Sequence, residues 1–578
     1  MAIVEADIKL LQSQRLNDDP DGGGFMTGVV VPDGVENNLF PDIADADRVF
    51  GRVQLRKVYI AVTSEDSDVY MGAHVILDGV PADPAANALM VTKKGYSQVR
   101  SDLVAALDTS NYKVAPDATK RILGGAVLTA TVTSSMQAQY VPPSIINYWS
   151  GTHYVQLHID GEIVAGEVLG LFTSNAAAPI PALAAMEVVY VGAVATGMDG
   201  NPHPLASLTL TRPVQNTYNS NTEVVYNSNS LYGYSSASDP NNYAVKLTQD
   251  TANGALTFYG QTTTTAALSL GATTLPVLSS WGQYIPVGDS GYPSVDPAIL
   301  GVDPANYAAT GGRVRIFRPN EACVLHHTAT TAPAAVTNGQ DVNLGRTLLS
   351  KVRVFGNDGN EITAGFTPNL ATGHVVFNDV SGYSQPVTIQ HRIEDMLLVT
   401  AALEQSLEVN RAITHAYPSG AKVSSVMMFG DMQAKVHEGF DQATWTSVWS
   451  DTLIGSNTAA EFNEAATPIT VTNKGAITER WALIFTNSTT FRVVGEQVGE
   501  ILVGNTATDT APLNPATLAP YFTIPAAGWG SGWAAGNVYR FNTDGANAPV
   551  WLIRSIAPSD PFVGQDSMTV AIRGNVDA

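Results

Sequence analysis

The sequence has a single cysteine and few charged side chains. Asp, Glu, Lys and Arg make up 14% of its 578 residues, against about 25% in ordinary globular domains. A lone Cys323 excludes an intramolecular disulfide, and with it a disulfide-stapled secreted scaffold or a zinc site built from several thiolates. Basic residues are scarcer than acidic ones: the chain has 30 Lys and Arg and 52 Asp and Glu, which gives a net charge of −22. We therefore expect no direct nucleic-acid binding, because phosphate-binding surfaces are basic.

Long apolar runs are also missing. Residues 1–16 are interrupted by Glu5, Asp7 and Lys9, so they do not resemble a cleavable secretion signal. The most apolar later stretch, 176–198, contains two prolines and Glu187, which makes it a poor membrane span. These features predict a protein made in the cytoplasm that does not insert into a membrane.

Motifs for common enzyme chemistries are absent too. The nearest approach to a Gly-x-Ser-x-Gly nucleophile elbow, at 528–532, places its serine one position late, and there is no phosphate-binding loop or dinucleotide fingerprint. We expect no enzyme activity and no cofactor. A carboxylate pair for glycoside cleavage has no fixed spacing in sequence, so a polysaccharide-degrading spike stays an alternative. The regular short repeats of a β-helix spike are not found.

Metal binding has little support in the sequence. His326 and His327 are adjacent, so on a strand they would point to opposite faces and could not bind one ion together. Asp18, Asp19 and Asp21 lie beside three glycines but lack the alternating oxygen donors and closing glutamate of an EF-hand. We therefore expect no metal site.

Thr, Ser, Asn, Gly and Ala replace the missing charge, a mixture typical of strands and turns. Period-2 alternation and Asp-Gly or Asn-Gly turns predict hairpins at 154–164 and 351–366. Strands are also expected at 481–485 and 538–541, with 550–553 returning against the second of these. A short amphipathic helix is expected within 97–107, and strands are favoured over a helix for 389–415 because its flanks resemble hairpins.

The expected fold is mainly β, with several antiparallel sandwich or barrel-like domains, few short helices and an extended N-terminal arm. The predicted divisions are an acidic arm at 1–50, a β-rich domain with a short helix at 51–145, a β domain with an Asn/Tyr-rich excursion at 146–320, a β domain at 321–420 and an aromatic-rich C-terminal β domain at 421–578.

Three segments are candidate interfaces. The acidic, Gly- and Pro-rich arm is expected either to become ordered against a basic groove of a neighbouring subunit or to stay a poorly ordered tail. The Asn/Tyr-rich stretch 215–242 is either a binding surface or a long surface loop. Most C-terminal aromatics are assigned to a core, while two glycine-flanked tryptophans are expected to be exposed. The candidate interface residues are Asp18, Asp19, Asp21, Phe40, Tyr218, Tyr226, Tyr232, Tyr234, Trp529 and Trp533.

Several short segments toward both ends of the chain have a distinctive amino-acid sequence. They are LQSQRL at 11–16, DGGG at 21–24, MTG at 26–28, NNLFPDI at 37–43, HRIEDM at 391–396, FDQATW at 440–445, WSD at 449–451 and GAITERWALIFTN at 475–487. In these runs the chain resembles structural proteins encoded by tailed bacteriophages and prophages.

The resemblance implies a virion component of the tail or baseplate, assembled in the host cytoplasm with copies of itself and other phage structural proteins. Two alternatives stay open. One is a tail fibre or spike that binds, and possibly degrades, a receptor or host-surface glycan; the other is a head or neck structural protein.

Overall fold

The computed structural model describes four parts of the chain. They are residues 3–106 (without 51, 93 and 94), the strands between 112 and 249, residues 257–282, and residues 314–576 (without 334, 404, 557, 558, 561 and 563–565). In these parts the fold is mainly β, with several antiparallel sheets, as the composition predicted. The two α-helices of the described residues are short: α1 (Asp45–Phe50) and α2 (Arg100–Ala106), the second within the predicted helical stretch. No helix in the same parts is both long and apolar enough to cross a membrane.

The centre of the molecule, here called the body, is built on a six-stranded antiparallel sheet. In sheet order its strands are β15 (Thr257–Tyr259), β5 (Ala86–Thr92), β36 (Asn547–Ile556), β3 (Arg52–Val62), β1 (Ile8–Arg15) and β2 (Gly23–Val30). Strand β3 is buried along almost its whole length because β36 and β1 flank it and both of its faces are covered. Its alternating side chains enter different cores: Val58 and Ile60 face one, Tyr59 and Ala61 another.

A three-stranded sheet covers one face of the body. Strand β4 (Tyr70–Gly79) lies between β29 (Met427–Met432) and β37 (Thr569–Val576). Val75 and Leu77 of β4 share a core with Val58 and Ile60 of β3, so the two sheets form a sandwich. A 3₁₀ turn, η1 (Glu5–Asp7), precedes β1.

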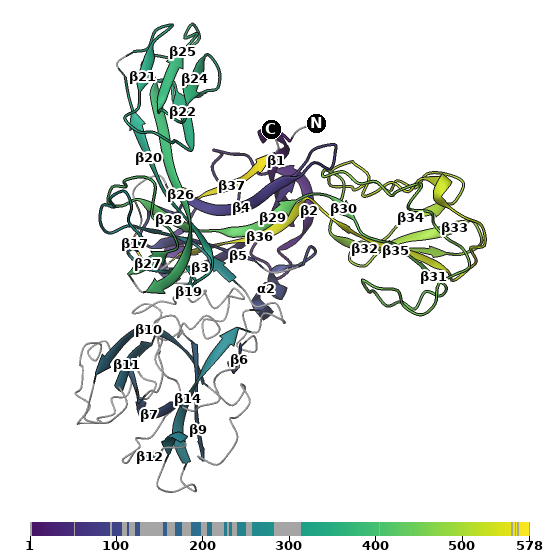
Figure 1. Cartoon of the computed structure of the whole chain (residues 1–578), viewed down its shortest axis with the longest axis horizontal. Coiled ribbons are helices and arrows are strands. Elements are labelled where there is room, and N and C mark those ends of the chain that lie inside the picture. Colours follow the sequence, from purple (N-terminus) through teal and green to yellow (C-terminus); the bar gives the residue numbers. More distant parts are fainter. Residues whose placement is uncertain are drawn as a thin grey trace.

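An upper lobe, formed around a long strand, rises from the body (Figure 1). Its eight-stranded sheet contains β16 (Gln261–Thr263), β28 (Lys422–Ser425), β20 (Ala322–Thr331), β26 (Thr388–Leu403), β22 (Lys351–Phe355) and β23 (Glu361–Ile362), with β17 (Thr274–Pro276) and β27 (Ser406–Val409) joined through β26. A three-stranded sheet of β21 (Asp341–Asn343), β25 (His374–Phe377) and β24 (Phe366–Asn369) completes the lobe. The strands favoured for 389–415 are confirmed by β26 and β27, and the hairpin expected at 351–366 by the pairing of β22 with β23.

A C-terminal lobe projects from another side of the body (Figure 1). Its sheet runs β30 (Lys435–Val436), β35 (Val538–Asp544), β32 (Glu479–Phe485), β33 (Thr490–Gly495) and β34 (Gly499–Asn505), with β31 (Phe440–Gln442) also on β35, and η6 (Ala526–Gly528) lies in a loop. The expected return of 550–553 against 538–541 is wrong. Strand β36 follows β35 after only Gly545 and Ala546, but it leaves the lobe and pairs with β3 and β5 of the body.

A third group of strands lies between residues 112 and 249. They are β6 (Tyr112–Val114), β14 (Pro240–Gln249), β7 (Ile122–Val127), β8 (Tyr154–His158), β11 (Leu205–Leu210), β10 (Glu187–Gly197) and β9 (Val168–Asn175). Because β14 pairs with β9 as well as β7, the path of pairings returns to its start, as in a barrel. Strand β8 is present as predicted, but β7 and β11 are its partners; the return strand expected after Asp160 lies outside the described residues. Two small pairs are separate: β12 (Val225–Asn227) with β13 (Ser230–Gly233), and β18 (Trp281–Gly282) with β19 (Val314–Arg315).

These sheets correct the predicted domain limits. The body takes strands from 1–92, from 257–259, from 427–432 and from 547–576, so it crosses the limits at 50, 145, 320 and 420. The upper lobe likewise includes β16 and β17, which precede 320. Proline-rich turns predicted limits from local composition, but antiparallel pairing joins segments hundreds of residues apart, which no local signal reveals.

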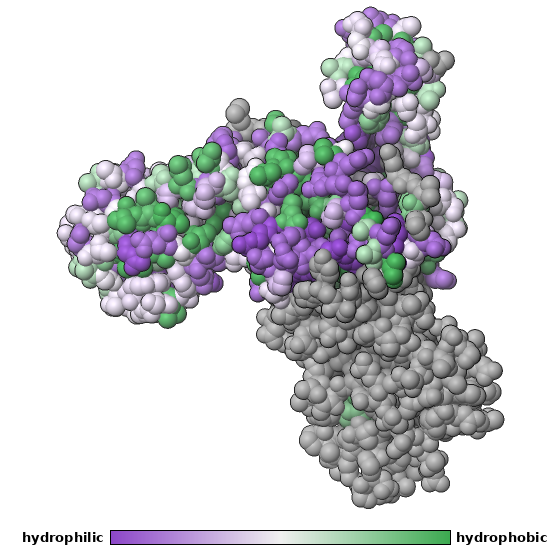
Figure 2. All heavy atoms as spheres, turned by 180° about the vertical axis from the view of Figure 1, so that it is seen from behind, coloured by the Kyte–Doolittle hydropathy of each residue, from purple (hydrophilic) through white to green (hydrophobic). Residues whose placement is uncertain are grey.

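Exposed large apolar side chains occur on the body, the upper lobe and the C-terminal lobe. Seen from behind, hydrophobic residues gather on that lobe and on the adjoining body, whereas the upper lobe is mostly hydrophilic or neutral in colour (Figure 2). The exposed large hydrophobic residues of the C-terminal lobe are Val448, Leu453, Leu502, Val503, Leu513 and Leu518.

Candidate functional site

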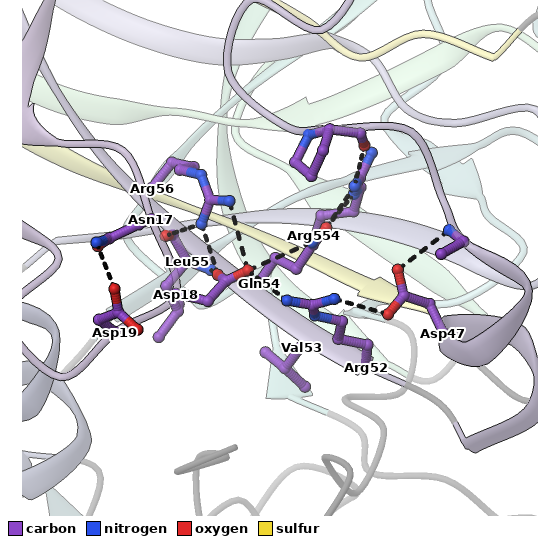
Figure 3. A network of polar contacts seen from close by, with 12 residues as sticks. Asn17, Asp18, Asp19, Asp47, Arg52, Val53, Gln54, Leu55, Arg56 and Arg554 are labelled. Atoms are coloured by element: carbon purple, nitrogen blue, oxygen red, sulfur yellow. Dashed lines mark hydrogen bonds and ion pairs between the residues drawn. The ribbon is translucent and has the colours of Figure 1, made fainter. Parts of the chain in front are cut away.

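Asp18 lies at the centre of a charge cluster on the body (Figure 3). It follows β1, and its side chain is only 6% exposed. Its carboxylate receives three guanidinium groups: Arg56 at 2.5 Å and Arg100 at 3.1 Å contact Oδ1, and Arg52 at 3.1 Å contacts Oδ2. The Leu55 backbone N–H also points at Oδ1, at 3.4 Å. A carboxylate in this position joins the N-terminal segment to β3 and α2.

The electrostatics of this cluster favour a charged Asp18. Burial by itself would raise the pKa of the Asp18 carboxyl. The hydrogen bond and charge of Arg56, with the charges of Arg100 and Arg52, outweigh burial and hold the pKa below its usual value. Three cations around one anion leave an excess of positive charge, which Asp47 reduces by accepting from Arg52 at 2.8 Å.

Phe40 belongs to the same cluster. It is buried, and its ring lies beneath two guanidinium groups, with Arg554 4.9 Å and Arg56 5.3 Å from the ring centroid. Arg554 also donates to the Pro41 carbonyl at 2.5 Å, and Arg56 Nε donates to the Leu39 carbonyl at 2.9 Å. The segment around Phe40 is therefore held on β3 and β36 by cation–π and hydrogen-bond contacts.

The basic residues expected in a neighbouring subunit are thus found in the chain itself. Arg52, Gln54 and Arg56 alternate onto one face of β3, and Arg554 of β36 pairs directly with Gln54. The first strands of the supposed arm, β1 and β2, belong to the central sheet. The extended-arm prediction is wrong for these residues because composition does not reveal the partner strand.

Asp19 and Asp21 are exposed and lie outside the cluster. Asp19 accepts a hydrogen bond from Asn17 Nδ2 at 2.6 Å. Asp21 pairs with Arg15 at 3.3 Å, and both of these side chains are more than half exposed. Exposed pairs of this kind contribute little stability.

The two glycine-flanked tryptophans are packed inside the C-terminal lobe, which corrects the expectation that they are exposed. Trp533 is 3% exposed and stacks on Phe485, with ring centroids 4.3 Å apart and an interplanar angle of 7°. Trp529 is half-buried, 4.8 Å from Phe462 in an edge-to-face arrangement. A Cβ on Gly528 would lie 2.3 Å from the Phe462 ring. That glycine therefore permits close aromatic packing, which sequence alone does not distinguish from an exposed flexible loop.

The four candidate tyrosines fall in the part of the chain that is least described. Tyr226 lies in β12 and Tyr232 in β13, which pair antiparallel, so at least this part of the Asn/Tyr-rich stretch is a small hairpin. Tyr218 and Tyr234 lie outside the described residues.

A second charge cluster joins the upper lobe to the body. Arg392 of β26 forms ion pairs with Asp78 of β4 and with Glu394, and Arg573 of β37 reaches Glu394 at 2.7 Å. His326 lies beside these charges and contacts Ser424 Oγ at 3.2 Å. Burial, followed by the charge of Arg392, lowers the pKa of His326 to about 3, so its imidazole is neutral at physiological pH.

His327, as predicted for the next residue of a strand, has different neighbours from His326. Its Nδ1 lies 2.9 Å from Arg346 Nη2. Among the described residues, no three His, Cys, Asp or Glu side chains are grouped so that they could hold a metal ion.

Lys57 is a buried ionisable side chain that sequence reasoning missed, and burial lowers the pKa of its ammonium group to about 7. It is fully buried in β3, and its Nζ donates to the carbonyl oxygens of Tyr96 at 2.8 Å, Gln98 at 3.0 Å and Gly24 at 3.1 Å. The phenol of Tyr59 donates to the Gly24 carbonyl as well, at 2.6 Å. The one available signal was a lysine directly before the apolar run 58–62 of the same strand. Lys57 fixes the loop before α2 onto the central sheet.

Trp445 and Trp449 are the other residues whose placement differs from expectation. Both were grouped with the aromatic core, yet both keep part of their surface exposed.

Comparison of the chain with protein-family models, curated proteins and solved structures finds no match. The function proposed below therefore rests on this chain's own residues.

Proposed function

We propose that the protein is a structural component of a tailed-phage virion, in the tail or baseplate, and that it acts by assembling with copies of itself and with other phage proteins. The resemblance of its terminal segments to phage structural proteins supports this function. The structural observation that carries it is the open edge of the C-terminal lobe.

Strand β34 forms that edge. Among the described residues it pairs with β33 alone, so one side of its backbone is left without a partner strand. Leu502 is 37% and Val503 60% exposed at consecutive positions, which places an apolar side chain on each face of the edge. Proteins that stay monomeric usually protect such edges with charges, prolines or covering loops, because an exposed apolar edge recruits further strands.

The sequence of β34 suits pairing with a second copy. In an antiparallel pair centred on Val503, beyond the register shift between Glu500 and Leu502, Leu502 lies opposite Gly504. Like charges are then not placed opposite each other, and Glu500 keeps its ion pair with Arg492, at 2.6 Å in the same chain. A two-fold contact of this kind is the commonest way in which identical subunits associate.

The two charge clusters give the body the rigidity that an assembly unit needs. One joins the N-terminal segment, β3, α2 and β36 through Asp18 and its arginines. The other joins the upper lobe to the body through Arg392, Asp78 and Glu394. The C-terminal lobe, which carries the edge, is joined to the body by Asn473, whose Nδ2 donates to Ser64 Oγ at 3.0 Å and to the Asp68 carbonyl at 2.8 Å.

The substitution Val503→Lys tests the assembly edge. We expect sedimentation velocity to show concentration-dependent association of the wild-type chain, and expect the variant to shift towards monomer because the lysine charge must be buried in the new pair. Val49→Lys is the matched control, since Val49 of α1 is 64% exposed. A wild-type chain that stays monomeric, and that mass spectrometry does not find in purified phage particles, would disprove the proposal.

A further inference from the structure

The C-terminal lobe carries a loop with two tryptophans that are neither buried nor free to move independently. Trp445 and Trp449 follow β31, and their ring centroids are 5.1 Å apart at an interplanar angle of 70°. Neither indole N–H donates to a group in the described part of the chain, whereas Trp481 in the core of the lobe donates to Thr543 Oγ1 at 2.8 Å. The pair thus offers ring surface and hydrogen-bond donors to solvent.

Arg540 fixes this loop in advance of any ligand. Its guanidinium is buried beneath the loop and donates to the Ser450 carbonyl at 2.8 Å and the Thr452 carbonyl at 2.7 Å. Its Nε donates to Gln442 Oε1 at 2.9 Å, and Gln442 in turn donates to the Thr444 carbonyl at 2.6 Å. Both ends of the loop are therefore attached to β31 and β35, which reduces the entropy that binding would otherwise cost.

The turn of the loop is backbone-strained. Ser447 has a φ of +60°, a left-handed conformation that costs about 1 kcal/mol or more for a residue with a side chain. Ser447 is exposed, and so is Val448 beside it. A strained turn between Trp445 and Trp449 sets the spacing of the two rings.

Polar side chains follow the tryptophans closely in sequence. Asp451 is 64% exposed, and its carboxylate is oriented by Arg480, at 2.7 and 3.1 Å, and by Asn542 Nδ2, at 2.9 Å. The hydrogen bond from Arg480 holds the pKa of Asp451 below its usual value, so the group is a carboxylate at neutral pH. Glu496 accepts from Arg480 at 2.8 Å on the same surface.

We propose that the loop of residues 444–453 is a saccharide-binding site. The C–H face of a pyranose ring stacks on the exposed indole surface of Trp445 or Trp449, and its hydroxyl groups hydrogen-bond to Asp451, Asn542 and the free indole N–H groups. A protein partner fits this surface less well, because the centres of protein interfaces are depleted of charged residues, while here the exposed carboxylate of Asp451 follows Trp449 by two residues. The site does not depend on the assembly edge at β34.

Saturation-transfer NMR on the full chain, with a panel of methyl glycosides of hexoses, N-acetylhexosamines and uronic acids, tests the site. We expect transfer to the ring C–H protons of at least one glycoside. Trp449→Ala should weaken that binding by about tenfold or more, the loss expected for one stacking contact, and Trp449→Phe should retain part of it. Phe366→Ala, which truncates a half-buried aromatic of the upper lobe, should leave it unchanged.

Two outcomes would overturn the site. One is that no glycoside of the panel receives transfer from the wild type, or that Trp449→Ala, unfolding at the same temperature as the wild type, binds the glycoside as well as the wild type does. The other is that Trp449→Ala abolishes self-association in sedimentation velocity, which would make the loop a protein contact. The proposal of an assembly edge is tested separately, by sedimentation velocity of Val503→Lys, so failure of one proposal can be distinguished from failure of the other.

Discussion

Replacing Asp18 by asparagine should open the body of the molecule. The substitution keeps the size of the side chain and an oxygen that accepts from the Leu55 N–H, but it removes the negative charge shared by Arg52, Arg56 and Arg100. The Arg56 and Arg100 side chains are 4% and 1% exposed, so water cannot replace the missing carboxylate. Two buried cations then remain without their counter-ion.

The size of the destabilisation depends on which hydrogen bonds the arginines keep after the substitution. Breaking a buried ion pair by removing one partner costs about 3–5 kcal/mol. Arg56 would still donate to the carbonyls of Leu39 and Leu55, and Arg100 to the Asp18 carbonyl. We therefore expect the lower end of the range, about 3 kcal/mol.

Hydrogen exchange is the appropriate measurement, because a chain with several lobes does not unfold in one step. Amides of β1 and β3 that exchange through opening of the body should exchange about 100-fold faster in Asp18→Asn than in the wild type. Asp19→Asn, an exposed neighbour, is the control and should stay within about 0.5 kcal/mol. Equal exchange in the two variants would refute the assignment of Asp18 as the centre of the cluster.

The same residue predicts an acid dependence. Because the pKa of Asp18 is lower in the folded state than its ordinary value of 3.8, its contribution to stability is complete above that value and is lost as the pH falls through the folded pKa. Protection of β3 amides should decline in this acidic range in the wild type, and Asp18→Asn should lack this component.

Three further variants test other parts of the structure. Lys57→Met removes the Nζ donor shared by the Gly24, Tyr96 and Gln98 carbonyls, which keep only the Gly24 N–H and the Tyr59 hydroxyl, so it should cost about 1 kcal/mol and make the loop at 95–98 more sensitive to protease; an unchanged cleavage pattern would contradict this. Trp533→Ala should destabilise the C-terminal lobe by about 3–5 kcal/mol, seen as a lower-temperature calorimetric transition, whereas an exposed Trp533 would give no shift. Burial, with the charges of Glu461 and Glu464, raises the pKa of Asp441 from 3.8 to about 6, so stability of the lobe should fall as the pH rises between these values, and Asp441→Asn should abolish that slope in thermal unfolding.

The fold class followed from local signals because alternation and turn chemistry act over a few residues. The hairpin β22–β23 and the strands β26 and β27 were accessible in this way. The partner of β36 could not be predicted from local signals. The sequence of β36 fits equally well beside β35, the preceding strand, and beside β3, which lies almost 500 residues earlier in the chain. Which pairing forms depends on the complete body, and single-sequence patterns carry no information on it.

The candidate residues show the same division between local and long-range information. Composition singled out Asp18 and Phe40 as contact residues, and both do make contacts, but with arginines of their own chain. Glycines around Trp533 suggested an exposed loop, while the structure uses Gly528 for close aromatic packing. Lys57 could not be identified because its partners are backbone carbonyls, which every sequence contains.

The direct passage from β35 into β36 determines how the C-terminal lobe responds to force. Only Gly545 and Ala546 separate the last strand of the lobe from a central strand of the body. A pull on the lobe acts along β36, which is held between β3 and β5. The bonds to both neighbours are then loaded together in shear and cannot open one after another as in a peeled hairpin. The lobe is thus mechanically continuous with the body, and tension on it would be borne by the central sheet.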